Sequence, residues 1–411
     1  MSGEPLAAQA ARARALLTAA AVREHCGEVM ACIERDGSRW FAWDASALDG
    51  AAAFVEAVIR ERHPDLRIPF HSRWRHFEAG GVDRWARLAH GTTLRERLLA
   101  DPQERARAML DLVVPSVLLD AGAGPAWHYR DGDAVLSRSE GLAVASLELV
   151  RRGALSSDPD WPCRADAVAL RRVSTDTLAD VFQVDAGNPL LGLAGRAELL
   201  RSLGRVVADR PDVFGATARV GNLVDHLRTL STGGRLEAAT VLRVLLDALG
   251  PAWPGRLRLG GVELGDTWPH PAATGGLVPF HKLSQWLAYS LLEPLQVAGL
   301  EVVGLDALTG LPEYRNGGLL IDTGLLRLRE PSLASERLAV DHPAVVEWRS
   351  ATVVALDRLA DAVRRRLGRD AAAMPLVRVL EGGTWVAGRR LAAARRAGAP
   401  PLQIDSDGTV F

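Results

Sequence analysis

Apolar residues recur at helical spacing through most of the 411-residue chain, and this periodicity limits its fold more than any other feature. Between 48 and 62, for example, Leu48, Val55 and Ile59 share one helix face. Helix signals outnumber strand signals, and strands and helices do not alternate as a parallel sheet requires. No repeat of fixed period occurs. The sequence therefore predicts a mainly α fold with small β-hairpin elements.

The expected elements follow from apolar spacing, capping residues and turn residues. Helices are predicted at about 5–21, 22–34, 48–62, 93–100, 102–119, 139–152, 174–182, 195–208, 221–230, 235–249, 280–298, 343–368 and 375–397. Short strands are predicted at 40–43, 300–304, 318–321 and 325–329, and a hairpin at 256–264.

No Ser/Gly/Pro-rich linker and no charge run divides the chain. We therefore expect one large helical domain over residues 1–411. If it is bilobal, the N-terminal lobe covers about 1–150 and the C-terminal lobe about 151–411.

The charges of the chain are balanced, with 49 Lys and Arg against 50 Asp and Glu. This balance argues against a general nucleic-acid or anionic-membrane binder, which needs a basic excess. No apolar run reaches the roughly 18 residues of a membrane helix. Cys26, Cys32 and Cys163 form no CxxC pair, which is typical of a reducing compartment. We expect a cytoplasmic protein, and no cofactor motif is present.

Lys282 is the single lysine of the chain, so the other 48 cations are arginines. A coding bias that replaces lysine by arginine explains the composition, and one lysine can survive by chance. A lysine that is kept for a chemical reason would instead mark a site that a guanidinium cannot serve. The neighbours of Lys282 decide between the two interpretations.

A Pro-bounded segment at 69–81 is dense in aromatic and basic side chains: His71, Arg73, Trp74, His76. One interpretation is a loop that binds an anionic or sugar-like ligand, with Arg73 forking onto a phosphate or carboxylate. The other is a structural loop that caps the core. The spacing of the two histidines matches no common zinc pattern, and no metal site is predicted.

A second polar segment follows the helix predicted to end near 119. Asp120 lies at a helix end that normally prefers a cation, which indicates a specific partner. Trp127 and Tyr129 come next, and Glu140 opens the following helix. These residues are candidates for substrate contact, or else a helix end, core aromatics and a first-turn acid.

The third segment begins at the lone lysine. His281, Lys282, Gln285 and Trp286 lie at the start of a predicted helix. Downstream, Glu313, Tyr314, Arg315 and Asn316 precede a glycine pair, and Asp322 follows. A lysine beside a carboxylate in an aromatic-lined site can tune that carboxylate or hold an anion. The alternative is a surface helix and a Gly-rich turn.

These segments together resemble the uracil-catabolism protein four family, which is encoded beside genes of a non-reductive uracil degradation route. The matching stretches are Leu118–Gly124 with Trp127 and Tyr129, Ser139–Ala145, His71–Phe77 and Glu313–Gly317. The resemblance covers nearly the whole chain. It implies a role in a route that opens the uracil ring and passes through a ribosylurea-type intermediate to urea.

A local similarity connects Lys282-Leu-Ser-Gln285 and Glu313-Tyr-Arg315 with elements of the queuosine-nucleotide salvage glycosylases. That similarity implies an architecture related to DNA glycosylases and an acidic residue that stabilises a ribosyl cation. The salvage glycosylases have an Asp where this chain has Glu313, so the carboxylate of this chain lies one methylene further from the backbone.

The leading hypothesis is an N-glycoside hydrolase that releases urea from a ribosyl or ribosyl-phosphate substrate. Glu313, with Asp322 as second choice, would stabilise the sugar cation, and Lys282 would set its ionisation or contact phosphate. Two rivals remain: a metal-dependent C–N hydrolase of a ring-opened pyrimidine, and a non-catalytic partner of a neighbouring enzyme. The sequence leaves the oligomeric state open.

Overall fold

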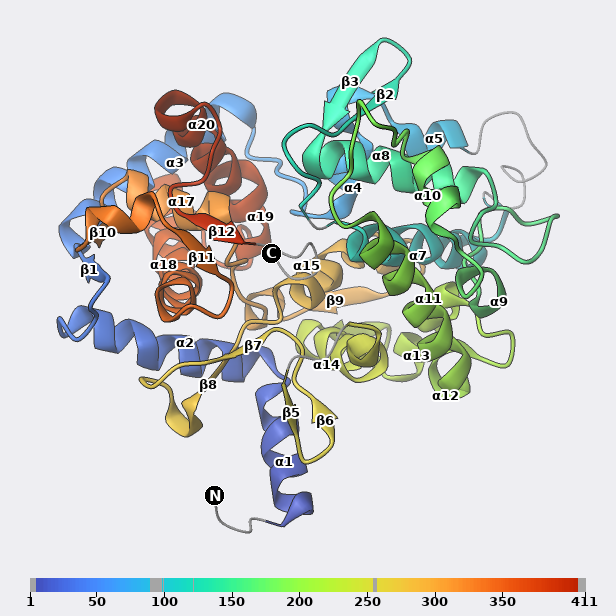
Figure 1. Ribbon diagram of the computed structural model, residues 1–411, viewed down its shortest axis with the longest axis horizontal. Coiled ribbons are helices and arrows are strands. Elements are labelled where there is room, and N and C mark those ends of the chain that lie inside the picture. The colour runs from blue at the N-terminus through green and yellow to red at the C-terminus, as the bar shows by residue number, and fades with distance from the viewer. Residues whose placement is uncertain (1–4, 89–97, 99, 121, 254–256, 406–411) are drawn as a thin grey trace. The chain divides into compact units, whose positions relative to one another are not determined.

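The computed structural model describes residues 5–88, 98, 100–120, 122–253 and 257–405. Helices dominate this part of the chain, and its strands form only two-stranded pairs, so the predicted mainly α fold is confirmed (Figure 1). The helix predicted at 93–100 lies almost entirely outside the described residues.

The chain packs as two compact units whose segments interleave along the sequence. Unit 1 takes its described residues from Met1–His71, Arg256–Gln285 and Gly304–Ser406, and unit 2 from Ser72–Gly255 and Trp286–Val303. A single domain with lobes divided near residue 150 stays a prediction. One boundary falls inside α15, which therefore contributes residues to both units.

Unit 1 is built around the long helix α18 (Figure 1). Its helices are α1 (Leu6–Leu16), α2 (Ala19–Glu34), α3 (Leu48–Arg62), the start of α15 (Lys282–Ser290), α17 (Tyr314–Asp322), α18 (Pro343–Leu367), α19 (Leu376–Val379) and α20 (Trp385–Arg396). Its strand pairs are β1 (Phe41–Trp43) with β10 (Leu326–Leu328), β5 (Arg258–Leu259) with β6 (Val262–Glu263), β7 (Thr267–Pro269) with β8 (Leu277–Pro279), and β11 (Arg337–Ala339) with β12 (Gln403–Asp405).

The sequence determines both ends of α18. Pro343 occupies its first turn, the His342 side chain accepts the Ala344 N–H, and Gly368 ends the helix at a φ of 63°. Between these ends, apolar residues such as Val353 and Leu356 are fully buried, because α2 and α3 both pack on this helix. Burial of this helix against its neighbours supplies the core of unit 1.

Unit 2 is organised around α7, which packs against α8, α11 and α16. Its helices are α4 (Arg73–Phe77), α5 (Arg84–Leu88), α7 (Pro102–Leu118), α8 (Arg138–Arg151), α9 (Ala167–Leu170), α10 (Thr175–Val181), α11 (Leu193–Asp209), α12 (Pro211–Phe214), α13 (Leu223–Thr229), α14 (Ala238–Leu249) and α16 (Leu292–Val297). Its strand pairs are β2 (His128–Asp131) with β3 (Ala134–Ser137) and β4 (Arg235–Glu237) with β9 (Glu301–Val303).

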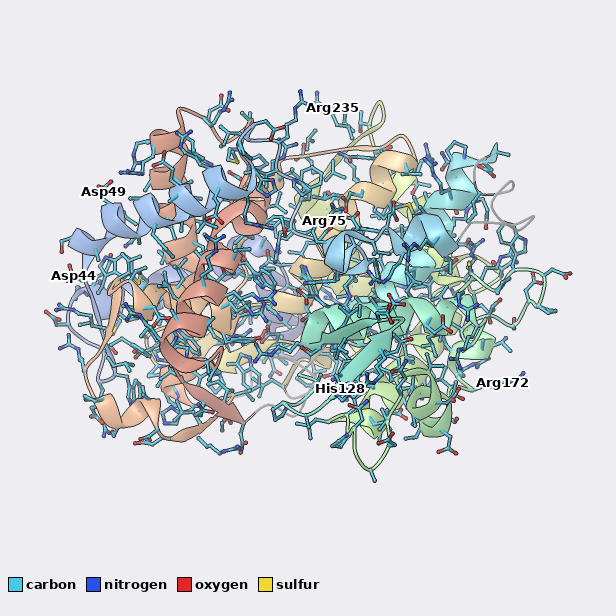
Figure 2. All side chains as sticks on the ribbon, turned by 90° about the horizontal axis from the view of Figure 1, so that it is seen from above. Asp44, Asp49, Arg75, His128, Arg172 and Arg235 are labelled. Atoms are coloured by element: carbon cyan, nitrogen blue, oxygen red, sulfur yellow. The ribbon has the colours of Figure 1, made fainter. Side chains whose placement is uncertain are left out.

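Exposed charged side chains such as Asp49 in unit 1 and Arg172 in unit 2 point outward (Figure 2).

Asp101 caps α7 by accepting the Gln103 N–H, and the helix is buried along most of its length. All three cysteines are free. None of the described helices is long and apolar enough to cross a membrane.

Several element predictions were wrong. The helix predicted at 235–249 begins with strand β4 at Arg235–Glu237, and the helix predicted at 280–298 is divided into α15 and α16. The strand predicted at 318–321 lies inside helix α17, which begins because Glu313 caps it. Gly317 and Gly318 are tolerated there because Trp348 and Pro401 pack directly against their backbones. The continuous helix predicted at 375–397 is interrupted by a π-helical turn at Leu380–Thr384.

Candidate functional site

The predicted site residues are divided between the two units. Unit 1 holds His71, His281, Lys282, Gln285, Glu313, Tyr314, Arg315, Asn316 and Asp322. Unit 2 holds Arg73, Trp74, His76, Asp120, Trp127, Tyr129, Glu140 and Trp286. The catalytic and substrate-binding roles of all of these residues stay predictions, and their geometry is described unit by unit.

In unit 1, the predicted residues His71, Tyr314 and Arg315 gather around Trp385. The Arg315 guanidinium lies 4.3 Å from the Trp385 ring centroid and 5.3 Å from that of Tyr314. The His71 ring lies 6.0 Å from the same Trp385 ring, and His71 Nδ1 is 2.8 Å from Glu381 Oε2. We call His71, Tyr314, Arg315, Glu381 and Trp385 the Trp385 cluster.

Close backbone packing brings the elements of the Trp385 cluster together. A Cβ added to Gly388 of α20 would lie 2.2 Å from the Arg315 carbonyl oxygen, so only glycine lets α17 and α20 approach this closely. The π-helical turn is held in the same way, because Gly382 and Gly383 pack against Ile68 and Val55. Such turns interrupt the helical register and occur often at functional sites.

Glu381 and His71 form a buried acid–base pair. The two residues are 8% and 5% exposed. The backbone N–H of His71 donates to the Val377 carbonyl at 3.1 Å, and Arg62 Nη1 donates to the backbone carbonyl of Glu381 at 2.7 Å. Nδ1 of His71 is taken by Glu381, and Nε2 has no hydrogen-bond partner among the described residues. An imidazole held in this way can pass a proton through Nε2.

Several buried polar atoms beside the Trp385 cluster lack a partner among the described residues. They are Arg315 Nη1, Asn316 Oδ1 and Thr384 Oγ1. A buried polar atom without a partner costs about 1–3 kcal/mol. The set supplies one charged donor, one amide acceptor and one hydroxyl, which can recognise a polar ligand.

Glu313 and Asp322, two of the three residues predicted to be catalytic, each have hydrogen-bond partners at the ends of α17. Both carboxylate oxygens of Glu313 accept backbone N–H groups of the first turn of α17, from Arg315 at 2.8 Å and Asn316 at 2.6 Å. Asp322, at the far end of α17, is held bidentately by Arg396 at 2.7 and 2.6 Å. At 1.5 Å per residue, the two carboxylates lie roughly 13 Å apart along the helix.

Lys282 and His281 lie beside the buried Asp266. The backbone N–H of Lys282 donates to Asp266 Oδ2 at 3.0 Å, and Arg349 binds both carboxylate oxygens of Asp266 at 2.8 and 2.7 Å. Burial alone would raise the pKa of Asp266, but Arg349 and the other donors overcome it and lower the pKa to about 2. The His281 Nε2 lies 2.9 Å from the Leu16 carbonyl oxygen, and burial lowers the pKa of His281. These contacts are structural ones.

Gln285 uses its whole amide within unit 1. Its Nε2 donates to Thr309 Oγ1 at 2.5 Å and to the Phe280 carbonyl at 3.1 Å, while its Oε1 accepts the Thr309 N–H at 2.7 Å. The contacts pin α15 to the segment before α17.

In unit 2, Arg73 is completely buried and forms the centre of a polar cluster. Its Nη1 donates to Asp120 Oδ1 at 2.7 Å, its Nε donates to Ser116 Oγ at 2.8 Å, and its guanidinium lies 5.6 Å from the Trp286 ring centroid. Asp120 thus has the specific cationic partner that its position predicted. The pair ties α4 to the end of α7.

The other predicted residues of unit 2 lie in its interior, except Glu140, which is partly exposed. His76 contacts the Trp286 ring, with 5.6 Å between centroids, and Trp74 Nε1 donates to the Ser290 carbonyl. Trp127 Nε1 donates to the Phe182 carbonyl at 3.0 Å, and burial raises the pKa of Tyr129 to about 12. Glu140 lies in the first turn of α8.

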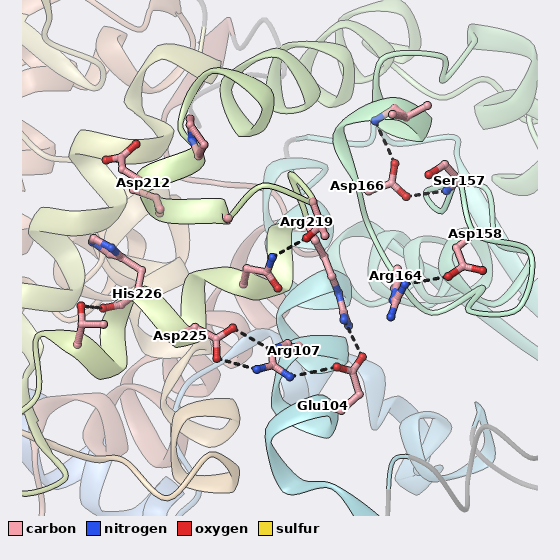
Figure 3. A pocket seen from close by; sticks show the side chains of 17 residues that line it. Glu104, Arg107, Ser157, Asp158, Arg164, Asp166, Asp212, Arg219, Asp225 and His226 are labelled. Carbon is pink, nitrogen blue, oxygen red and sulfur yellow. Dashed lines mark hydrogen bonds and ion pairs between the residues drawn. The ribbon is translucent and has the colours of Figure 1, made fainter.

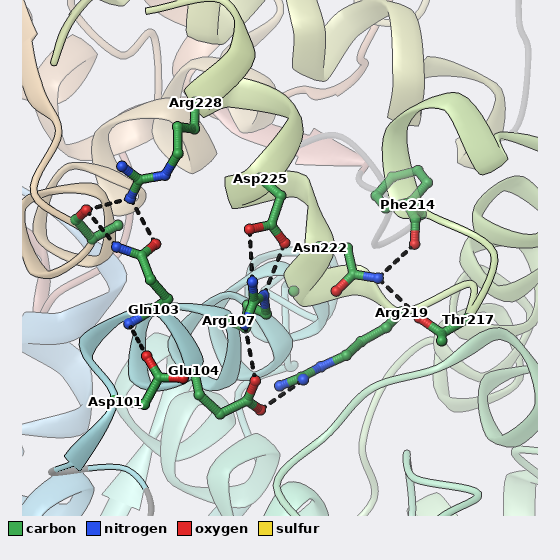
Figure 4. Close-up of polar contacts among 12 residues, drawn as sticks. Asp101, Gln103, Glu104, Arg107, Phe214, Thr217, Arg219, Asn222, Asp225 and Arg228 are labelled. Atoms are coloured by element: carbon green, nitrogen blue, oxygen red, sulfur yellow. Dashed lines mark hydrogen bonds and ion pairs between the residues drawn. The ribbon is translucent and has the colours of Figure 1, made fainter. Parts of the chain in front are cut away.

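Unit 2 also contains a cleft of ≈ 680 Å³ that the sequence did not predict (Figure 3). Several of its acids form ion pairs with its arginines. Arg107 binds both Asp225 oxygens at 2.8 Å, and Arg219 binds Glu104 at 2.7 Å (Figure 4). Arg219 Nε also donates to the buried Asp111 at 2.7 Å. Burial raises the pKa of Asp111 to about 6, and Arg219 only partly opposes this effect.

Among the described residues, no three His, Cys, Asp or Glu side chains gather where they could hold a metal ion. The Trp385 cluster offers one histidine and one carboxylate, which is fewer ligands than metal sites usually provide.

Comparison with known proteins identifies the family. A family model described as a protein of unknown function (DUF1688) matches residues 15–411, and the chain belongs to this family. The chain is 39% identical over 405 residues to Protein urg3 of Schizosaccharomyces pombe, covering 96% of this chain and 98% of that protein. It is 36% identical over 433 residues to Uracil catabolism protein 4 of Lachancea kluyveri, covering 95% and 97%. The predicted family resemblance is confirmed.

Sequence reasoning missed Glu381 and Trp385, although it named their partners His71 and Arg315. Both residues lie in a stretch that has the apolar spacing of an uninterrupted helix. The available signal was the Gly382–Gly383 pair, because two glycines inside such a helix indicate a close approach or a distortion. The cleft of unit 2 gave no signal, since its paired charges come from scattered segments.

Proposed function

We propose that this protein acts in uracil catabolism, in the cytoplasm, as an N-glycoside hydrolase that releases urea from a ribosylurea-type substrate, with or without a 5′-phosphate. The name of one relative, Uracil catabolism protein 4, supports the pathway, at 36% identity over nearly the whole chain. The Trp385 cluster supports the reaction class.

One observation carries the reaction class: a buried carboxylate–imidazole pair lies next to an arginine with an unpaired donor. Cleavage of an N-glycosidic bond builds positive charge on the sugar and negative charge on the leaving nitrogen. An imidazole can transfer the proton that this cleavage requires. Arg315 Nη1 can donate to an oxygen of the urea group or of a phosphate.

The carboxylate contacts favour Glu381 for this chemistry over the predicted Glu313 and Asp322. Glu313 is engaged by backbone N–H groups and Asp322 by Arg396, whereas Glu381 contacts a group that exchanges protons. Catalytic roles for Glu313, Lys282 and Asp322 remain separate predictions.

The test is urea release from ribosylurea and from its 5′-phosphate by the purified protein. We expect turnover by the wild type and a loss of about 10- to 100-fold in kcat/KM for Arg315→Ala, since a hydrogen bond to a charged group is lost. Arg390→Ala is the matched control, because Arg390 lies on the exposed side of α20 and pairs with Glu61. Circular dichroism would verify the fold of each variant.

Three results would overturn this proposal. The first is wild-type protein that releases no urea from either substrate. The second is turnover that requires added zinc, with one equivalent of bound metal by elemental analysis, which favours the metal-dependent C–N hydrolase. The third is turnover only after a neighbouring pathway enzyme is added, which favours the non-catalytic partner.

A further inference from the structure

Unit 1 contains two buried Glu–His pairs whose surroundings differ. In the first, His71 Nδ1 lies 2.8 Å from Glu381, and Nε2 has no hydrogen-bond partner among the described residues. In the second, His270 Nε2 lies 3.4 Å from Glu347, and His270 Nδ1 accepts the Ala272 N–H at 3.2 Å. Both ring nitrogens of His270 are therefore engaged, whereas His71 keeps one ring nitrogen available.

We propose that His71 is the general base of the reaction, acting through Nε2, and that Glu381 is its positioning residue. This inference rests on the proposed hydrolase function and goes beyond the substrate contact predicted for His71. Glu381 accepts a proton-bearing Nδ1, which fixes the tautomer with an unprotonated Nε2. The backbone N–H of His71 donates to the Val377 carbonyl, which fixes the main chain there, and the Trp385 ring lies beside the imidazole.

The step balances without a cofactor. His71 Nε2 takes one proton from a water molecule while the water oxygen bonds to the anomeric carbon. The carbon–nitrogen bond breaks, and its electron pair goes to the urea nitrogen. That nitrogen then receives the proton from the imidazolium, so one substrate and one water give the free sugar and urea. Glu381 stays ionised and stabilises the transient imidazolium.

The geometry of the π-helical turn supports this role for Glu381. The turn breaks the helical register at Leu380–Thr384, and Arg62 holds its carbonyl groups, with Nη1 2.7 Å from the Glu381 oxygen. Gly382 and Gly383 admit Ile68 and Val55 at distances that a Cβ would not allow. The backbone that carries Glu381 is thus held by contacts that do not involve His71.

The experiment combines nitrogen NMR with kinetics on the full-length protein. With ¹⁵N-labelled histidine, the His71 signals are those lost in His71→Asn. We expect Nδ1 protonated and Nε2 unprotonated in the wild type, and a changed tautomer population in Glu381→Ala. In urea release, Glu381→Ala and the more conservative Glu381→Gln should lower kcat by about 10²–10⁴-fold, with KM changed by less than about threefold.

Glu347→Gln is the matched control, because it alters the other buried Glu–His pair of unit 1. It should leave the His71 signals and kcat unchanged. A wild-type His71 with both ring nitrogens protonated at the pH of activity would overturn the general-base role. So would an active Glu381→Gln enzyme with wild-type kcat. If wild-type protein releases no urea while the NMR result holds, the proposed function fails and the tautomer control by Glu381 stands.

Discussion

The Trp385 cluster of unit 1 and the cleft of unit 2 both contain carboxylates beside basic side chains, but the basic groups differ. Glu104 and Asp225 line the cleft and are paired with arginines, as is the buried Asp111, which binds the lining residue Arg219. In the Trp385 cluster, Glu381 lies 2.8 Å from His71 Nδ1 and 3.7 Å from Arg62 Nη2, so it has a histidine as well as an arginine beside it. Arginine does not lose its proton in proteins, whereas histidine exchanges one near neutral pH. A polar cavity alone therefore does not mark the chemical site; the partner of each carboxylate does.

Among the variants considered, Arg219→Ala should give the largest change in stability. Arg219 is buried and binds Glu104 and Asp111, so its loss leaves the buried Asp111 without a cation, while Glu104 keeps Arg107. We expect the free energy of unfolding to fall by about 3–5 kcal/mol in urea denaturation. Urea release per folded molecule should not change, because we assign the ion pairs of the cleft to stability and not to the reaction.

A second variant controls for simple misfolding. Asp111→Asn in the Arg219→Ala background removes one stranded charge and should recover part of the lost stability. A reduced kcat for a folded Arg219→Ala protein would contradict the structural interpretation of the cleft.

The pH dependence of stability should show the same contrast at Asp111. Its pKa is raised to about 6 by burial, above its value near 3.9 in an unfolded chain. The folded protein therefore holds this proton more tightly. The contribution of Asp111 to stability is greatest below about pH 4 and falls by about 3 kcal/mol as the pH rises through 6. Unfolding of wild type and Asp111→Asn, compared from pH 4 to 7, measures it; a constant difference would contradict it.

Asp266 in unit 1 should show the opposite sign. Burial would raise its pKa, but Arg349 binds it bidentately, Trp268 and the Lys282 N–H also donate, and the pKa falls to about 2. Its contribution of about 2 kcal/mol is present above pH 4 and is lost as the pH falls towards 2. Acid unfolding of wild type and Asp266→Asn would show this difference; stability that rises on acidification through this carboxylate would refute the assignment.

Helix positions could be predicted where the apolar spacing and the residues at both ends indicated the same helix. The helix predicted at 48–62 is α3, because its apolar spacing and its ends agree. The strand predicted at 318–321 failed because Trp348 and Pro401 pack on the two glycines and keep them helical. Such contacts join residues far apart in the chain, and a single sequence does not contain them.

The site was predictable only in part for the same reason. His71 and Arg315 were named from their unusual neighbourhoods, and the fold places both beside Trp385. Glu381 remained hidden because a carboxylate in a helix-like stretch is usually solvated. Glu313, the predicted partner of Lys282, caps its own helix, and its pairing with Lys282 stays a prediction.

Glu313→Gln should give the smallest effect. It tests whether Glu313 differs from Glu381, the other carboxylate of unit 1 considered for catalysis. A glutamine still accepts a backbone N–H at the start of α17 but loses the favourable charge at the helix N-terminus, so we expect a loss of about 1 kcal/mol in stability. The kcat for urea release should change by less than threefold. Because Glu381→Gln removes the same charge at a site with a proton-exchanging partner, the two variants form a matched pair. A 100-fold loss of kcat in Glu313→Gln, with wild-type rates in Glu381→Gln, would move the chemistry to the start of α17. The capping contacts would then be a resting arrangement that the substrate displaces.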